Sequence, residues 1–183
     1  MAARGGARAR PERNRSMSKV RFEHHLKLPP SLVRAALAEI LASIAAGADV
    51  WRDFTFHVDL RAAHLPDVGY IAIPIHLQLA PPREGVDQLD IQIESAKRHA
   101  SFPTFHGAMG VDATNADSSE SMLWLAGDYE LPIHALGALV DATLAAGIAQ
   151  LCLSNFLDDV AQACAARVEK RENDFVRYRH YGQ

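Results

Sequence analysis

Nine histidines are the first candidates for chemistry in this chain. No two of them have the i,i+4 spacing that places two ligands on one helix face, and neither an HExxH nor a Cys-x-x-Cys motif occurs. We therefore expect no metal site and no cofactor. Serine, histidine and aspartate are plentiful, but no GxSxG motif marks a nucleophile, so no catalytic residue is assigned. The histidines are His24, His25, His57, His64, His76, His99, His106, His134 and His180.

Two polar residues share a side with apolar residues of predicted strands. His24 alternates in phase with Phe22 and Leu26, and Arg52 with Phe54. The first interpretation of His24 is a hydrogen-bonded histidine at the rim of a sheet. For Arg52 it is an arginine whose charged end reaches water from a strand end. The alternative places both side chains inside a ligand cavity, where the guanidinium could hold a carboxylate or a polarised carbonyl.

Aromatic residues near the end of the strand region are further candidates. Tyr129 precedes a Pro132 turn and is interpreted as packing that turn, with its hydroxyl bonded to backbone. Trp124 is interpreted as either a core residue or a cavity wall. Asp141 could be a buried polar contact of the following helix or face solvent.

The elements that must position these residues are read from hydrophobic periodicity. Alternation with period two predicts strands near residues 20–28, 53–60, 69–79, 89–94 and 121–127. Pro74 cannot donate to a ladder, so its strand is expected to lie at a sheet edge or to bulge there. Pro103, Gly107 and Gly110 predict an irregular or bulged strand within 101–111.

Helical periodicity appears twice. Ser31 is a plausible N-cap for a helix that continues to about Ala45. A second pattern runs from about His134 to about Lys170 and would measure about 55 Å if straight. Because that length exceeds a domain of this size, we expect a break near Ala145-Ala146-Gly147.

Strands followed by one long terminal helix predict an α+β fold. In it, a curved antiparallel β-sheet is wrapped around the C-terminal helix, with an apolar cavity between them. The residues predicted to line the cavity are His24, Arg52, Phe54, Phe56, Ile73, Ile91, Trp124, Tyr129, Leu136, Val140 and Leu144.

This order of elements resembles the START-like superfamily, also called SRPBCC, over roughly residues 19–171. The resemblance rests on the opening strand Val20 to Leu28 and on the turn Gly127-x-Tyr129-x-x-Pro132 before Leu136-Gly137. The superfamily includes polyketide cyclases, lipid-transfer domains and birch-pollen-type allergens. The resemblance implies a helix-grip fold and binding of a hydrophobic or amphipathic molecule. Because the superfamily shares no universal catalytic residue, the resemblance assigns none to this chain. One departure is that only one helix is predicted between the opening strand and Phe54, where the family usually has two.

The composition limits the classes of partner that we expect for this chain. Residues 1–17 hold five arginines and one glutamate and read as a disordered basic tail. The remaining chain has 14 basic and 21 acidic residues, a net charge of −7 against −3 for the whole chain. An acidic body is a poor match for phosphate backbones, so nucleic-acid binding is not expected. No apolar run reaches the roughly 20 residues that span a bilayer, so stable membrane insertion is not expected either.

The predicted boundaries are a tail at 1–17, one domain at 18–171 and a C-terminal tail at 172–183. Cys152 and Cys164 lie 12 residues apart in the helical pattern, about 18 Å of rise, and cannot form a disulfide with each other. Unpaired thiols favour a reducing compartment, and we predict a cytoplasmic location.

Three hypotheses of function remain open at this point. The first is binding of a lipid-like or polyketide-like small molecule in the cavity. The second is an enzyme of the polyketide cyclase or aromatase kind that uses polar groups of the same cavity. The third is an interaction module whose interior is filled by its own side chains. The sequence does not specify the ligand or the oligomeric state.

Overall fold

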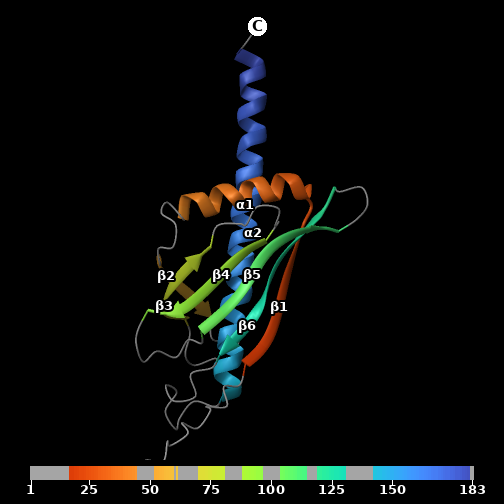
Figure 1. Cartoon of the computed structure of the whole chain (residues 1–183). Coiled ribbons are helices and arrows are strands. Elements are labelled where there is room, and N and C mark those ends of the chain that lie inside the picture. The colour runs from red at the N-terminus through yellow and green to blue at the C-terminus, as the bar shows by residue number, and fades with distance from the viewer. Residues whose placement is uncertain are drawn as a thin grey trace, which may run out of the picture.

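The computed structural model describes residues 17–44, 52–59, 61, 70–80, 88–96, 104–114, 119–130 and 142–181. These residues form six strands and two helices (Figure 1). In chain order they are β1 (Met17–Leu26), α1 (Pro30–Ile44), β2 (Arg52–Asp59), β3 (Tyr70–Leu79), β4 (Gln88–Ser95), β5 (Thr104–Ala113), β6 (Ser121–Glu130) and α2 (Ala142–Tyr181).

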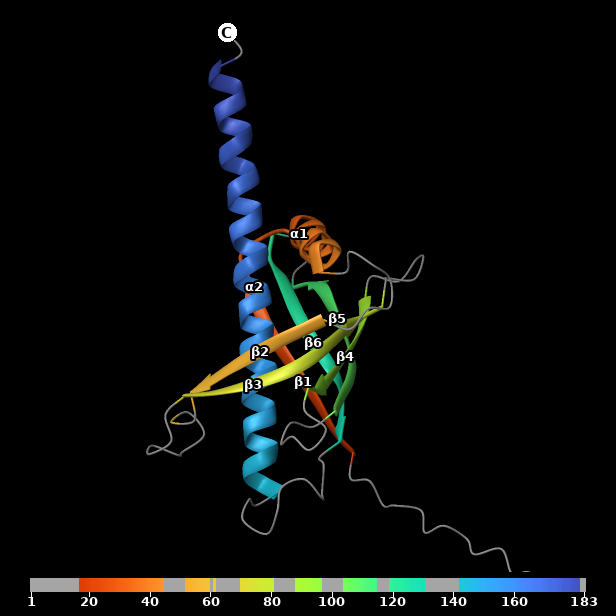
Figure 2. The ribbon, with the colours of Figure 1, turned by 90° about the vertical axis from the view of Figure 1, so that its left-hand side faces the viewer.

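The strands form one antiparallel sheet in the order β1-β6-β5-β4-β3-β2. The sheet curves, and α2 lies along its concave side while α1 crosses near one end (Figures 1 and 2). The prediction of a curved antiparallel sheet around a C-terminal helix is therefore confirmed. The edge strands are β1 and β2, and both approach α2 closely.

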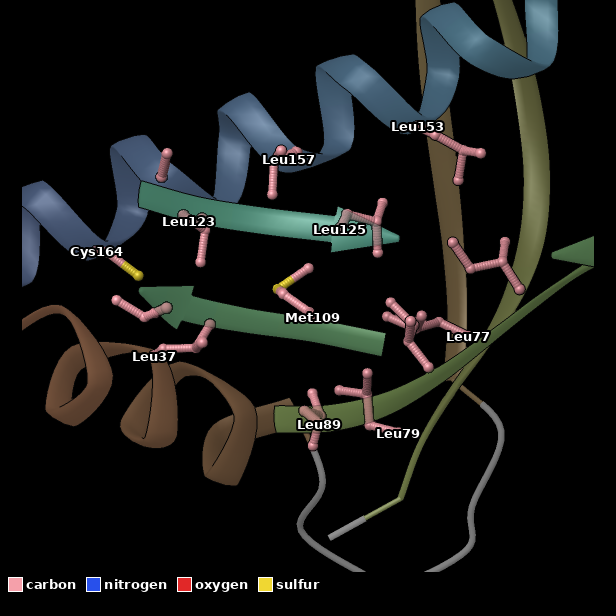
Figure 3. Packing of buried hydrophobic residues seen from close by; sticks show 14 of the residues in the cluster. Leu37, Leu77, Leu79, Leu89, Met109, Leu123, Leu125, Leu153, Leu157 and Cys164 are labelled. Carbon is pink, nitrogen blue, oxygen red and sulfur yellow. The ribbon is translucent and has the colours of Figure 1, made fainter. Parts of the chain in front are cut away.

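One hydrophobic core lies between the sheet, α2 and α1 (Figure 3). Leu153 and Leu157 enter it from α2, Leu123 and Leu125 from β6, and Leu37 from α1. Burial of such side chains is the main favourable term in folding, at about 25 cal/mol per Å² of apolar surface. The core therefore fixes how the helix sits against the inner face.

Polar contacts fasten α1 to this arrangement. The Arg34 guanidinium donates two hydrogen bonds to the carbonyl oxygen of Val111 in β5, at 2.9 and 3.2 Å. Glu39 pairs with Arg167 and Arg171 of α2. These ion pairs are half exposed, so each is worth little alone.

The first helix begins two residues earlier than a Ser31 cap predicts. It starts at Pro30, and the Pro29 carbonyl accepts the first bonds from the N–H groups of Leu32 and Val33. Ser31 is therefore inside the first turn and is not the N-cap. Proline suits this first position because its fixed φ is helical and its missing N–H would be unpaired there anyway.

The predicted break in the second helix is wrong. From Ala142 to Tyr181 the helix is continuous through Gly147, about 60 Å in 40 residues. The extra length is accommodated because the C-terminal part projects beyond α1 (Figures 1 and 2). Residues 172–181 thus continue α2 and do not form a separate tail. The predicted helical residues 134–141 lie outside the described residues.

The expectation for Pro74 is also wrong, because β3 is flanked by β2 and β4 and pairs with β2 without a bulge. Pairing with β4 ends at Ile75, and the Pro74 carbonyl accepts a bond from Ala96 just beyond. In antiparallel strands the N–H and C=O of one residue point to the same neighbour. The N–H that proline lacks would therefore have pointed toward β4 beyond the end of its pairing with β3, so no hydrogen bond of that ladder is lost.

Two other boundaries differ. β5 is a regular strand with continuous pairing on both sides, so the predicted irregularity within 104–111 is wrong; residues 101–103 lie outside the described residues. β1 includes Met17 and ends at Leu26, two residues before the predicted end. The rest of the predicted basic tail, residues 1–16, also lies outside the described residues.

Candidate functional site

The inner face of the sheet is almost wholly apolar. Phe56, Ile91 and Tyr129, three of the predicted lining residues, are buried there, at 9%, 3% and 3% exposure. Ile73 and Phe54 occupy the same rows but are less covered, and Phe54, at 37%, is the one exposed large apolar side chain among the described residues. The inner face is therefore closed in its middle and partly open at its margin.

The two edge strands meet α2 at the same helical turn, through contacts of opposite character. On the β2 side, the rings of Phe56 and Phe156 meet edge to face, with centroids 5.9 Å apart. On the β1 side, His24 Nδ1 lies 2.7 Å from a carboxylate oxygen of Asp158. Because Phe156 and Asp158 are two residues apart, they point to nearly opposite sides of the helix. This turn of α2 thus links both edges of the sheet.

The His24–Asp158 pair lies at the boundary between the core and solvent. The His24 side chain is 31% exposed and that of Asp158 is 46% exposed. An ion pair with this much exposure contributes little to stability, about 0–1 kcal/mol. The interpretation of His24 as a hydrogen-bonded histidine at the sheet rim agrees with this position.

Tyr129 packs in a layer made possible by two glycines. It is the cross-strand partner of Phe105, which is fully buried, and the next inward pair is Gly107 with Gly127. A β-carbon at Gly107 would lie 2.5 Å from the Phe105 ring, so this ring lies over the space that the glycines leave. Tyr129 is consequently part of the packed inner face.

Trp124 is on the other face of the sheet. Ser121, Leu123 and Leu125 point inward, so the alternation directs Trp124 outward. Its ring lies against Gly110, and the Arg21 guanidinium carbon is 5.0 Å from the ring centroid. It does not line the space facing α2, which corrects the prediction.

For the other residues that were predicted to line the cavity, the structure describes the backbone alone or nothing. Arg52 begins β2 and shares the inward row with Phe54, but its side chain lies outside the described residues. The same holds for the side chain of Leu144 in α2. Leu136, Val140 and Asp141 lie wholly outside them.

Three residues of this region were missed by the sequence reasoning. Phe156 and Asp158 hold the two sheet edges, and Ser121 is a fully buried hydroxyl with no hydrogen-bond partner among the described residues. Helical periodicity places Asp158 on the flank of the stripe that contains Leu157 and Ala161, which is the signal that could have indicated it.

Solved structures are similar to this chain in fold. Zhui aromatase/cyclase from a Streptomyces species is 16% identical, and the match covers 85% of this chain and 96% of that chain at a TM-score of 0.51. Ara h 8.0201 is 9% identical over 85% of this chain and 99% of that chain, at a TM-score of 0.50. A major latex protein family member from Arabidopsis thaliana is 8% identical over 82% and 95%, at a TM-score of 0.48.

This chain has the helix-grip fold. At these identities the likeness establishes the fold alone. No protein-family model matches the chain, and comparison with curated proteins gives no match. Within the described residues α1 is the one helix between β1 and β2, and residues 45–51, on which the expected departure from the family pattern depends, lie outside them.

Within the helix-grip fold, no group of three or more histidine, cysteine, aspartate or glutamate side chains in the described part of the chain could hold a metal ion. Neither described helix contains a stretch apolar enough to cross a membrane. The described inner face is largely apolar, and the His24–Asp158 pair lies at its margin.

The two thiols on α2 are free and buried, as the helical spacing predicted. Burial raises the pKa of Cys152 from 9.0 to about 12. It raises the pKa of Cys164 from 9.0 to about 11, with nearby Arg167 acting in the opposite sense. Because only the thiolate is nucleophilic, neither residue is suited to nucleophilic chemistry near neutral pH.

This burial predicts a loss of stability at alkaline pH. The unfolded chain releases the thiol protons from about pH 9, whereas the folded protein keeps them to higher pH, so stability falls as pH rises through this window. Between about pH 8 and about pH 10.5 each thiol should remove about 1–2 kcal/mol. Urea unfolding at both pH values measures this, and a Cys152→Ala, Cys164→Ala double variant should lose less over the same interval. An equal loss in both proteins would contradict the assignment.

Proposed function

We propose that this protein binds a hydrophobic or amphipathic small molecule between the sheet and α2. The observation that carries the proposal is the partly open apolar margin of the inner face. Phe54 is 37% exposed, and Phe22, Ile73 and Phe156 are each partly exposed while packed against the core. Covering such surface is favourable by about 25 cal/mol per Å². A ligand at this margin would extend a core that already exists.

The arrangement of α2 supports the same proposal. Among the strands, the helix backbone comes closest to β1, β6 and β2, and the strands β3–β5 arch around it. The side chains of these middle strands, such as Leu77, Ile93 and Met109, are apolar. The inner face behind the partly open margin is therefore apolar, with the His24–Asp158 pair at its edge, and small-molecule sites are mostly apolar with few polar groups.

Saturable binding of an uncharged apolar fluorophore tests the proposal. We expect N-phenylnaphthylamine to bind with a Kd on the order of 1–10 µM. Phe54→Ala should weaken binding about 5-fold, because it removes apolar contact at an exposed position. Thr55→Ala, the adjacent residue on the outer face, is the matched control and should not change the Kd. Native mass spectrometry of protein from its host should show a co-purifying apolar mass. Absence of both signals would refute the proposal.

The interaction module with a filled interior has one observation in its favour. Ile75, Ile93 and Leu125 in the middle of the inner face are 0% exposed, so their own neighbours already surround them. If the interior is complete without a ligand, the fluorophore should not bind, and a panel of lipids and polyketides should not shift the Tm.

The enzyme alternative is favoured by the His24–Asp158 contact. A carboxylate that orients an imidazole is the arrangement used for proton transfer in many active sites. It assigns no substrate or reaction.

A further inference from the structure

The contact between β1 and α2 forms a seam with an apolar and a polar part. Val20 and Phe22 lie in the same inward row as His24, and both are partly exposed. On α2, Leu151 and Ser154 precede Asp158 by seven and four residues, so they share its face of the helix. Leu151 and Ser154 are also partly exposed. The seam therefore presents a partly exposed apolar surface with the imidazole of His24 at one end.

The hydrogen bond to Asp158 determines which imidazole nitrogen carries the proton. An ionised carboxylate can only accept, so His24 Nδ1 must donate across the 2.7 Å contact. In the neutral imidazole the other nitrogen, Nε2, is then an acceptor. Asp158 is thus a positioning residue that fixes both the ring and its tautomer.

On the sheet side of the seam, His24 Nε2 is the one ring acceptor among the described residues. His24 forms no other hydrogen bond with the described residues, and it is the only imidazole or carboxylate in the described inward rows of the sheet. Tyr129, which could also meet a polar ligand group, is 3% exposed. A hydroxyl group of a ligand that reaches His24 in the seam can therefore donate a hydrogen bond to Nε2.

We propose that His24 Nε2 is the polar anchor for a ligand bound in the seam between β1 and α2, and that it selects apolar ligands that carry a hydroxyl group. A hydroxyl can donate to Nε2, whereas an ether or ester oxygen of the same shape cannot. This inference rests on the proposed binding function and narrows its ligand class to alcohols and phenols with an apolar body.

Matched ligand pairs test the anchor directly. The probes are naphthol and its methyl ether, and dodecanol and its methyl ether, each titrated directly by isothermal titration calorimetry. One net hydrogen bond predicts that the wild-type protein binds at least one hydroxyl form roughly 3- to 10-fold more tightly than its ether. In His24→Phe, which keeps a ring but removes the acceptor, this ratio should fall to about 1 while the ether affinity is retained. His25→Phe, on the outer face of the same strand, should keep the wild-type ratio.

The outcomes separate the anchor from the binding function. If the ethers bind but neither pair shows a preference, or if His24→Phe keeps the preference, the anchor is refuted and the binding function stands. If no probe of either kind binds, both proposals fail together.

The tautomer provides a second readout that needs no ligand. Nitrogen-15 spectra of the imidazoles at about pH 8.5, above the usual titration range of histidine, should show His24 protonated at Nδ1. In Asp158→Asn the amide can donate as well as accept, so a mixture of tautomers is expected. Asp159→Asn, the exposed neighbour, should leave the wild-type spectrum unchanged. A wild-type His24 protonated at Nε2 would overturn the proposal whatever the ligands do.

Discussion

Replacing Gly127 with alanine should destabilise the protein by about 3 kcal/mol or more, the upper range for overpacking a well-filled site. A β-carbon there would lie 2.5 Å from the Cα of Gly107 and 2.8 Å from the Phe105 ring, and it would also clash with the His106 carbonyl oxygen. Two of these three obstacles are backbone of the paired strand β5, which cannot rotate away. The substitution therefore forces β5 and β6 apart where the inner face is most tightly packed.

Gly147→Ala is the matched control, because it makes the same chemical change. No atom lies within 4 Å of a β-carbon built at Gly147 in α2. There the loss of backbone freedom in the unfolded chain should stabilise the protein by about 0.5–1 kcal/mol. Urea unfolding of both variants measures the two changes. Similar effects of the same sign would show that β5 and β6 are not packed as described.

Leu153→Ala should cost about 3–5 kcal/mol in the free energy of unfolding. Leu153 is fully buried and points from α2 into the core (Figure 3). Removing three carbons leaves a void whose size depends on how far its neighbours can relax, and a core this closed leaves them little freedom. Leu32→Ala, a half-buried leucine of α1, should cost clearly less when measured in the same urea titration.

This variant also bears on the choice between a ligand-binding interior and a filled one. A void lined by apolar side chains stays dry and can take up a small apolar molecule such as benzene. Benzene should therefore raise the Tm of Leu153→Ala more than that of the wild-type protein. A cost below about 1.5 kcal/mol, with no such rescue, would show that the wild-type interior is loosely packed around this residue.

The strands were predictable because one face of each is buried, which imposes period-two alternation on the sequence. The inward rows containing Phe56, Ile73 and Ile91 follow from that alternation. Trp124 was not assignable in this way, because both rows of β6 are rich in apolar residues. Its face was decided by neighbouring strands, where Gly110 leaves room and Arg21 covers the ring.

The errors in the fold share a physical cause, which is that local propensity was overruled by tertiary contacts. One glycine costs a helix about 1 kcal/mol. The helix residues before and after Gly147, such as Ala146 and Ile148, pack against the core, and this packing outweighs that cost. Pro74 is tolerated inside the sheet because β4 is short. The partnership of His24 with Asp158 joins residues 134 apart in sequence and leaves no local signal.

The pairing of β1 with β6 has a consequence for how the chain is made. The first strand, Met17–Leu26, finds its partner only at Ser121–Glu130, and the helix that covers it comes later still. At about 5–20 residues per second, a ribosome exposes β1 for roughly 5–20 s before β6 emerges. During that interval β1 is an apolar strand whose backbone N–H and C=O groups are unpaired, and it can associate with neighbouring nascent chains. We therefore expect folding during translation to depend on chaperones more than refolding from dilute denaturant does.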